Sequence, residues 1–179
     1  MKRLENKVAI VTGANSGIGK ATAIRFAQEG ATVVLCARRY ELLEEAAAEC
    51  RTYGVEALAV KADLTIHADC THVVEETIKN FGRVDILVNN AGIADKHRPI
   101  TECTDEWWDE VIAIDQTSLF YLTKDVLPHM GEGGSIVNVS SIGGVFGRGI
   151  GYFTEFDELK AENEELKKQL RENEQLVRD

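Results

Sequence analysis

The residues best suited to chemistry in this sequence form a glycine-rich turn near its amino terminus. The turn reads TGANSGIG from Thr12 to Gly19 and follows an apolar run that starts at Val8. A glycine lets the backbone approach a phosphate closely, because it has no side chain and tolerates positive φ. The helix-like pattern that follows, through Glu29, would point free N–H groups and the positive end of its dipole at an anion. The turn therefore predicts nucleotide binding, provided that the rest of the chain supplies the matching context.

The overall composition limits the classes of protein to which the chain could belong. Its 179 residues suffice for one domain with an appendage, and its net charge of -10 disfavours non-specific binding of nucleic acid. No apolar run approaches the roughly 20 residues that cross a bilayer. The residues before Val8 contain no apolar stretch of the signal-peptide type. We therefore expect a cytoplasmic protein with neither nucleic acid nor a membrane as its partner.

The cysteines and histidines show no spacing that is typical of a metal site. They stand at Cys36, Cys50, Cys70, Cys103, His67, His72, His97 and His129. No CxxC pair occurs among them, and both the cysteines and the histidines are dispersed along the chain. We expect reduced, structural thiols and no metal.

Short apolar runs alternate with longer helix-like segments along most of the chain. The expected strands span residues 8–12, 31–36, 56–60, 84–88 and 134–139, and the expected helices span residues 20–29, 40–53, 68–80 and 105–129. This alternation implies right-handed βαβ crossovers. It predicts an α/β fold with a doubly wound (Rossmann-like), mostly parallel five-stranded sheet, whose ligands bind beyond the carboxyl ends of the strands.

The composition changes abruptly after a glycine-rich loop at residues 143–151. Residues 155–179 contain neither glycine nor proline, and apolar residues recur there at heptad spacing. The seam positions are Phe156, Leu159, Asn163, Leu166, Leu170, Asn173 and Val177. The pattern is typical of a coiled coil, although a solvated helix lying on the domain is the alternative, because two asparagines weaken so short a seam. We expect one domain at residues 1–151 and an acidic, coiled-coil-like helix at residues 152–179.

Four short motifs, each at the end of an expected strand, occur in an order that resembles one family. The glycine-rich turn follows the first strand and Asp63-Leu64 the third, while NNAG from Asn89 to Gly92 follows the fourth and Ser140-Ser141 the fifth. Residues 4–151 thus resemble the short-chain dehydrogenase/reductase family, of the type that includes 3-oxoacyl-carrier-protein reductases. The resemblance implies a nicotinamide dinucleotide cofactor and a carbonyl or secondary alcohol as substrate.

The resemblance also implies a role for each motif. The turn would lie over the cofactor phosphates, and Asp63 would hold the adenine ring with Leu64 beside it. The NNAG motif would shape the nicotinamide side, and Ser141 would hydrogen-bond the substrate oxygen. The residues that would contact the cofactor in this way are Gly13, Ser16, Gly17, Ile18, Gly19, Asp63, Leu64, Asn90, Ala91 and Gly92.

The end of the second expected strand bears on the choice of cofactor. NAD-binding versions of the fold place an acid about 20 residues past the glycine turn, whereas this chain reads Cys36-Ala37-Arg38-Arg39 there. No carboxylate repels a 2′-phosphate, and a guanidinium matches its geometry. We therefore expect Arg38 and Arg39 to favour NADP(H), with NAD(H) as second choice. The alternative is that both arginines are solvated loop charges.

Two departures from the family pattern concern catalysis. Asp115 stands where the family has an asparagine that helps to relay protons, so an amide donor is replaced by a negative charge. Tyr152 is the only tyrosine after Ser141, and Phe156 stands four residues later in place of the lysine that lowers the tyrosine pKa. Lys160, about two helical turns after Tyr152, is an unfavourable substitute. The candidate catalytic residues are thus Ser141, Tyr152 and Asp115, and we expect weak or absent hydride transfer.

Three functions remain open from the sequence. The chain could be the cofactor-binding half of a reductase that holds NADP(H) without using it, or a working oxidoreductase that relies on Tyr152, Ser141 and Lys160. It could also be an interaction protein on an inactive platform. In that case it would self-associate through the tail helix or through the helix at residues 105–129, which lies at a subunit interface in the resembled family.

Overall fold

The computed structural model describes residues 2–93 and 100–141. The chain divides into two compact units, of which the first is Met1–Asp95 with Cys103–Ser140 and the second is Lys96–Glu102 with Ser141–Asp179. The first unit holds all the strands described below. In the second, the short 3-10 helix η1 (Ile100–Glu102) is described. The expected tail helix and the expected boundary at residue 151 lie outside the described residues.

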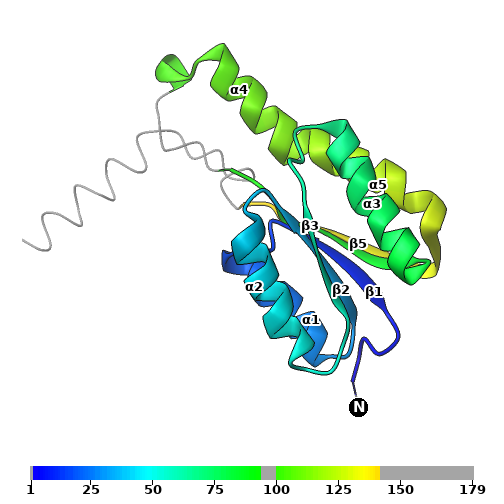
Figure 1. Cartoon of the computed structure of the whole chain (residues 1–179). Coiled ribbons are helices and arrows are strands. Elements are labelled where there is room, and N and C mark those ends of the chain that lie inside the picture. Colours follow the sequence, from blue (N-terminus) through cyan, green and yellow to red (C-terminus); the bar gives the residue numbers. More distant parts are fainter. Residues whose placement is uncertain (1, 94–99, 142–179) are drawn as a thin grey trace, which may run out of the picture. The chain divides into compact units, whose positions relative to one another are not determined.

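The first unit is built on a parallel sheet of five strands in the order β3-β2-β1-β4-β5 (Figure 1). The strands are β1 (Val8–Thr12), β2 (Thr32–Ala37), β3 (Ala57–Lys61), β4 (Val84–Asn89) and β5 (Met130–Asn138). This order is that of the first five strands of the dinucleotide-binding fold. The doubly wound, Rossmann-like architecture expected from the sequence is therefore confirmed.

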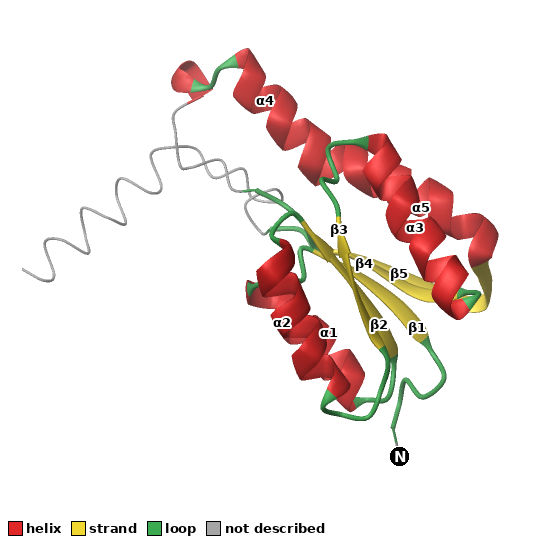
Figure 2. Cartoon of the chain, in the orientation of Figure 1, coloured by secondary structure: helices red, strands yellow, loops and turns green. Residues whose placement is uncertain are grey.

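Helices cover both faces of the sheet (Figure 2). They are α1 (Gly17–Gln28) and α2 (Tyr40–Arg51) on one face, and α3 (His67–Phe81) and α5 (Ser118–Val126) on the other. Successive strand residues point to opposite faces, so Val11 joins the core under α1 and α2 while Ile10 joins the core under α3 and α5. Among the described residues no helix has the length and apolar run that crossing a bilayer requires.

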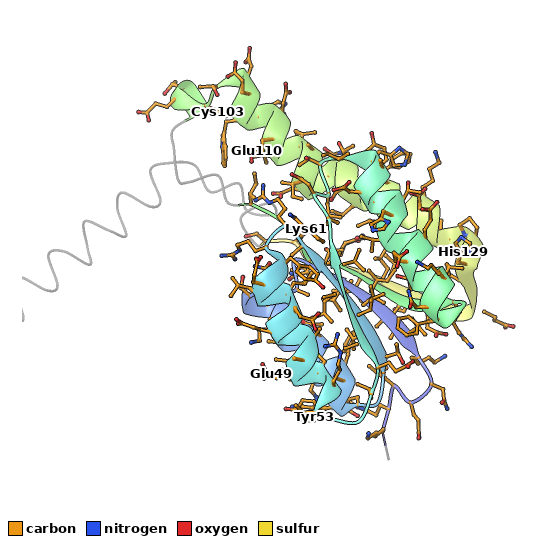
Figure 3. The ribbon with its side chains drawn as sticks, in the orientation of Figure 1. Glu49, Tyr53, Lys61, Cys103, Glu110 and His129 are labelled. Atoms are coloured by element: carbon orange, nitrogen blue, oxygen red, sulfur yellow. The ribbon has the colours of Figure 1, made fainter. Side chains whose placement is uncertain are left out.

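The helix expected at residues 105–129 is interrupted. It consists of α4 (Asp105–Ile112), a π-helical turn η2 (Ala113–Thr117), α5 and a final 3-10 turn η3 (Leu127–His129). Figure 3 labels Glu110 within α4 and His129 at the end of η3. Nothing in the residue pattern indicated the π-turn, which places Asp115 next to the loop that follows β4.

Two element boundaries differ from the sequence expectation because glycines are used inside elements. Helix α1 begins at Gly17 rather than at residue 20, so two of the turn's glycines lie in its first turn. Strand β5 begins at Met130 rather than at residue 134, and an irregularity between the pairs Val84–Met130 and Ile86–Ser135 accommodates the glycine-rich residues between them.

The cysteines are free thiols, as the sequence indicated, and most are buried. Burial raises the pKa of Cys50 to about 11 and that of Cys70 to about 12, and it raises the pKa of Cys36 further. Protonated thiols in an apolar core are unreactive, so these three side chains serve packing.

The buried carboxylate of Asp85 connects the amino-terminal ends of β1 and β4. Asp85 Oδ2 accepts a hydrogen bond from the Val8 N–H at 2.9 Å, and Asp85 Oδ1 pairs with Lys7 Nζ at 3.5 Å and with Arg83. Burial raises the pKa of this carboxyl, but the Val8 N–H and the two cations lower it by more. The net pKa is therefore below its ordinary value.

This carboxylate should make stability depend on pH. A group whose pKa is lowered by folding stabilises the fold above its unfolded pKa, and the contribution is lost as pH falls through the folded value. We expect Asp85→Ala to lower the free energy of unfolding by about 1–3 kcal/mol at neutral pH. The deficit should shrink below about pH 4, where an unfolded aspartate becomes protonated. Urea unfolding across this range measures it, with the exposed Glu75→Ala on α3 as control. A deficit that is constant with pH would contradict the assignment.

Candidate functional site

The glycine-rich turn between β1 and α1 needs its glycines for different reasons. Gly13 has φ +64° and Gly17 has φ +56°, conformations that side chains disfavour. A Cβ at Gly13 would also lie 3.0 Å from Ala91 Cα. Gly19 is needed for contact, because a Cβ there would lie 2.5 Å from the Gly13 carbonyl oxygen and 2.5 Å from Asn90 Nδ2. The turn is therefore packed directly against the loop that follows β4.

At the amino end of α1, the first backbone N–H groups have no hydrogen-bond partner among the described residues. The side chain of Ser16, at the N-cap, makes no capping hydrogen bond, and the first turn contains no acidic residue. Lys20 N–H donates to the Ser16 carbonyl at 3.2 Å, so the N–H groups before it have no partner within the helix. Ile18, which is 68% exposed, stands beside them. Such a helix end attracts an anionic group.

Thr12, at the end of β1, holds the loop that follows β4. Its buried Oγ1 accepts hydrogen bonds from the Asn90 N–H at 2.9 Å and the Ala91 N–H at 2.8 Å. The Asn90 amide in turn donates to the Thr12 carbonyl at 2.9 Å. These three bonds fix the NNAG motif against the glycine-rich turn. Thr12 opens the turn motif but was not among the site residues predicted from the sequence.

The two arginines that follow β2 are in different environments. Arg39 Nη2 donates to Ser16 Oγ at 3.4 Å. The Asn15 amide oxygen, in the orientation that satisfies its hydrogen bonds, accepts from Arg39 Nε at 3.0 Å and Nη2 at 2.7 Å. Arg38 is exposed, and its guanidinium makes no hydrogen bond or ion pair within residues 2–93 and 100–141. Arg39 therefore braces the glycine-rich turn, while Arg38 is available to a ligand.

The loop after β3 presents Asp63 at the same edge of the sheet. Lys61, at the carboxyl end of β3, lies just before it (Figure 3). Asp63 Oδ1 accepts hydrogen bonds from Thr65 N–H at 3.1 Å and Thr65 Oγ1 at 2.8 Å. The Asp63 N–H donates to Asp69 Oδ2 at 2.7 Å. Asp63 is thus held at both its side chain and its backbone.

Asp115 lies in the π-helical turn η2 and supports the loop after β4. Its Oδ1 accepts a hydrogen bond from the Ile93 N–H at 2.9 Å, and a Cβ at Gly92 would lie 3.2 Å from the same oxygen. An acceptor is sufficient for this bond, so the carboxylate serves here without an amide donor. The catalytic role of Asp115 stays a prediction, since the residue supports the pocket described next without lining it.

A pocket of about 570 Å³ lies at the carboxyl ends of β1 to β4 and is lined by all four of the loops that follow them. Its size is in the range of small-molecule and cofactor sites. The predicted cofactor residues that line it are Gly13, Ser16, Ile18, Arg38, Arg39, Asp63, Leu64, Asn90, Ala91 and Gly92. Gly17 and Gly19 shape the turn without lining the pocket.

Five further lining residues were not predicted from the sequence. These are Asn15, Ala37, Ala62, Ile93 and Ile114. Each adjoins a residue that was predicted, so the strand ends were a sufficient signal for the region. Ile114 differs from the others because it lies in the π-helical turn η2 and not in a loop that follows a strand.

The remaining predicted catalytic residues lie in the second unit or outside the described residues. Ser141 belongs to the second unit of the chain. Tyr152, like Lys160, lies outside the described residues. Their roles therefore remain predictions from the sequence.

Comparisons with known proteins agree with this geometry. A family model described as short chain dehydrogenase matches residues 7–153. The chain is 41% identical over 147 residues to a 3-oxoacyl-[acyl-carrier-protein] reductase of Thermotoga maritima. The aligned region covers 81% of this chain and 59% of that reductase. Two similar solved structures are an NAD+-bound xylitol dehydrogenase and a metagenomic short-chain oxidoreductase in complex with NADP.

Both solved structures match most of this chain and about three fifths of their own length. The xylitol dehydrogenase has a TM-score of 0.79 at 36% identity, covering 83% of this chain and 58% of its own. The metagenomic oxidoreductase has a TM-score of 0.74 at 35% identity, covering 78% of this chain and 64% of its own. The chain thus spans about three fifths of the length of these relatives. With the matched family model, the parallel sheet and the pocket at its carboxyl edge, the chain belongs to the short-chain dehydrogenase family.

Proposed function

We propose that the chain binds a nicotinamide dinucleotide in the pocket at the carboxyl edge of its sheet, NADP(H) in preference to NAD(H). The observation that carries this proposal is the convergence of the glycine-rich turn, the free end of α1, Arg38 and Asp63 on one pocket. A phosphate would lie on the N–H groups of the α1 end. Asp63 and Leu64 would hold the adenine, and the NNAG loop would hold the nicotinamide.

The fit rests on a cradle that only glycines allow. A Cβ at Gly13 or Gly19 would collide with the NNAG loop, and at Gly19 also with the Gly13 carbonyl, so only glycines allow the tight turn that presents its backbone to a phosphate. The similar structures support both cofactors, since one holds NADP and another holds NAD+. The preference for NADP(H) comes from this chain's own arginine and from the missing carboxylate after β2.

NADPH should raise the thermal midpoint of the purified chain, because a ligand that binds only the folded state stabilises it. At about 100 times its dissociation constant it would add about 2.7 kcal/mol to the free energy of unfolding. Differential scanning fluorimetry across an NADPH series measures the effect, and sodium phosphate at matched ionic strength is the control. A midpoint that stays constant over the series would contradict the proposal.

Replacing Arg38 should change the choice of cofactor. We expect Arg38→Ala to weaken NADPH binding about 10- to 100-fold, since a hydrogen-bonded charge is lost from the 2′-phosphate, and to leave NADH binding nearly unchanged. Arg25→Ala, at an exposed position toward the far end of α1, is the matched control. Fluorescence titrations with both cofactors give the ratio of dissociation constants. Equal weakening of NADPH and NADH would show that Arg38 does not read the phosphate.

By ancestry the reaction would be hydride transfer between the nicotinamide and a carbonyl or secondary alcohol. We infer that the chain alone performs it weakly or not at all, because the sequence has Phe156 where the family has the lysine that lowers the pKa of its tyrosine. NADPH oxidation with a panel of ketones tests this point. Rapid turnover that Tyr152→Phe abolishes would contradict the inference of weak or absent activity. It would favour the alternative that the chain is a working oxidoreductase. A cytoplasmic location is part of the same proposal.

A second proposal is self-association through the helix at residues 105–129, with the tail helix as the alternative interface. The observation that favours the first is that Trp108, Phe120 and Leu127 are 55%, 61% and 54% exposed along it. Aromatic side chains are enriched in protein interfaces, which favours Trp108 and Phe120 as interface residues.

Light scattering should therefore show a dimer that persists when the chain is cut after Gly151 and dissociates in Phe120→Lys. Leu42→Lys, at another exposed leucine on α2, is the control. A dimer that disappears only on removal of the tail would assign the interface to the tail helix instead. A monomer at all concentrations would contradict both.

A further inference from the structure

We propose that Asp69 and Thr65 are positioning residues that make this chain select adenine, by presenting one oxygen of Asp63 to the amino group of the base. The proposal rests on the dinucleotide function above and deepens it. Neither residue lines the pocket, so each would act through Asp63. The residues concerned all belong to the first unit of the chain.

The two oxygens of the Asp63 carboxylate are used differently. Oδ1 accepts two hydrogen bonds from Thr65, from its N–H at 3.1 Å and its hydroxyl at 2.8 Å. Within the described part of the chain, Oδ2 has no hydrogen-bond or ion-pair partner. Asp63 is half-buried at the wall of the pocket. Thr65 thereby fixes the carboxylate so that an acceptor, with no competing partner, is left for a ligand.

Asp69 fixes the backbone of the same residue. Its Oδ2 accepts the Asp63 N–H at 2.7 Å, a charge-assisted bond in a half-buried site. It lies in the first turn of α3, where a carboxylate is also favoured by the helix dipole. Since α3 is a regular helix packed on the sheet, Asp69 ties the Asp63 loop to a rigid element.

Two further bonds remove the remaining freedom of this loop. The Ile66 N–H donates to the Asp63 carbonyl at 2.9 Å, and the buried Cys70 thiol donates to the Leu64 carbonyl at 3.4 Å. Leu64 itself is only 2% exposed. The loop is thus anchored before a ligand arrives, and a ligand would not bear the entropic cost of ordering it.

This arrangement discriminates between purines. A carboxylate oxygen accepts from the exocyclic amine of adenine, but it meets the carbonyl oxygen of hypoxanthine as another acceptor, which leaves a partly buried charge unpaired. Thus the chain should bind NADPH more tightly than the analogue in which hypoxanthine replaces adenine. If Asp69 and Thr65 set the orientation of Asp63, their loss should reduce this ratio more than it reduces stability.

The experiment measures dissociation constants of NADPH and of its hypoxanthine analogue by fluorescence titration of the full chain. We expect the unsubstituted chain to prefer NADPH by about tenfold or more, the value of one hydrogen bond to a charged group. Asp69→Ala and Thr65→Val should each reduce this ratio to about threefold or less. Asp69→Asn and Thr65→Ser, which keep the required oxygen, should retain most of it. Glu75→Ala, which removes another carboxylate from α3, should leave the ratio unchanged.

The outcomes separate this proposal from the function on which it rests. If the unsubstituted chain does not bind NADPH, the proposed function fails and this assignment fails with it. If NADPH binds but the ratio is the same in Asp69→Ala and Thr65→Val, the assignment alone is wrong. Should Asp69→Ala fail to fold, Thr65→Val decides, because it leaves the backbone anchor of Asp63 intact. A reduced ratio in the alanine and valine variants with rescue by asparagine and serine supports the proposal.

Discussion

The Gly19→Ala variant should bind NADPH at least about 100-fold more weakly, a loss of about 2.8 kcal/mol, because the added methyl displaces the turn whose backbone would hold the phosphates. A methyl group at this position would lie 2.5 Å from the Gly13 carbonyl oxygen and 2.9 Å from its carbon. Both are backbone atoms, so the turn itself must move. The Asn90 amide, also 2.5 Å away, would be pushed from the bond that it donates to Thr12.

The expected change in stability is opposite in sign to the one that is usual for a helical glycine replaced by alanine. A helical glycine changed to alanine usually stabilises a protein by about 0.5–1 kcal/mol, because the unfolded chain loses freedom. Here we expect a loss of about 1–3 kcal/mol from overpacking. Urea unfolding and NADPH titration of the same samples measure both effects. Gly54→Ala, at a position with φ +78° and no atom within 4 Å of the added methyl, should bind NADPH normally. If Gly19→Ala is more stable and binds as before, the turn is not packed as described.

Among the near-isosteric substitutions proposed for this chain, Thr12→Val should lower the free energy of unfolding the most. Valine fills the same volume but removes the oxygen that accepts both the Asn90 and the Ala91 N–H groups. Because Thr12 is 1% exposed, water does not readily replace that oxygen. With about 1–3 kcal/mol for each unpaired donor, we expect a loss of about 2–4 kcal/mol in the free energy of unfolding.

The matched control is Thr12→Ser, which keeps the hydroxyl and removes a methyl group. It should cost about 1 kcal/mol, the value of one buried methyl, and leave NADPH binding intact. Chemical unfolding together with NADPH titration separates the two variants. If serine and valine have equal effects, the hydroxyl does not organise the NNAG loop, and the bond from the Asn90 amide to the Thr12 carbonyl would be sufficient to hold it.

The sequence predicted the centre of the sheet well because β1, β2 and β4 are buried on both faces and therefore appear as continuous apolar runs. Every residue of β1 is buried, and so are all but the first of β2. Strand β5 was the least well placed, since most of its residues are exposed and its first half is glycine-rich. There the apolar pattern is weak, and pairing with β4 decides where the strand begins.

The candidate site was predictable wherever a motif coincides with a strand end. Parallel strands end at one edge, so Gly13, Asp63 and Asn90 had to meet there once the topology was known. The different environments of Arg38 and Arg39 could not be predicted, because they depend on which guanidinium reaches Asn15 and Ser16 across the pocket mouth.

Hydrogen bonds between different elements also could not be predicted from the sequence. The support of Asp63 by Asp69 requires the start of α3 to fold back on the preceding loop. Similarly, the contact of Asp115 with Ile93 depends on a π-turn, which no local pattern specifies. Short hydrogen bonds between segments are set by tertiary packing, and residue spacing alone does not encode them.

The most direct test of the proposed dinucleotide function is a fluorescence titration of the purified, folded full chain with NADPH. Trp107 and Trp108 supply intrinsic emission, and the nicotinamide fluorescence is a second, independent signal. We predict saturable binding of one NADPH per chain, with NADH binding more weakly and Gly19→Ala binding NADPH at least about 100-fold more weakly. A folded chain, verified by circular dichroism, that shows no saturable change with either cofactor would contradict the function proposed for this pocket.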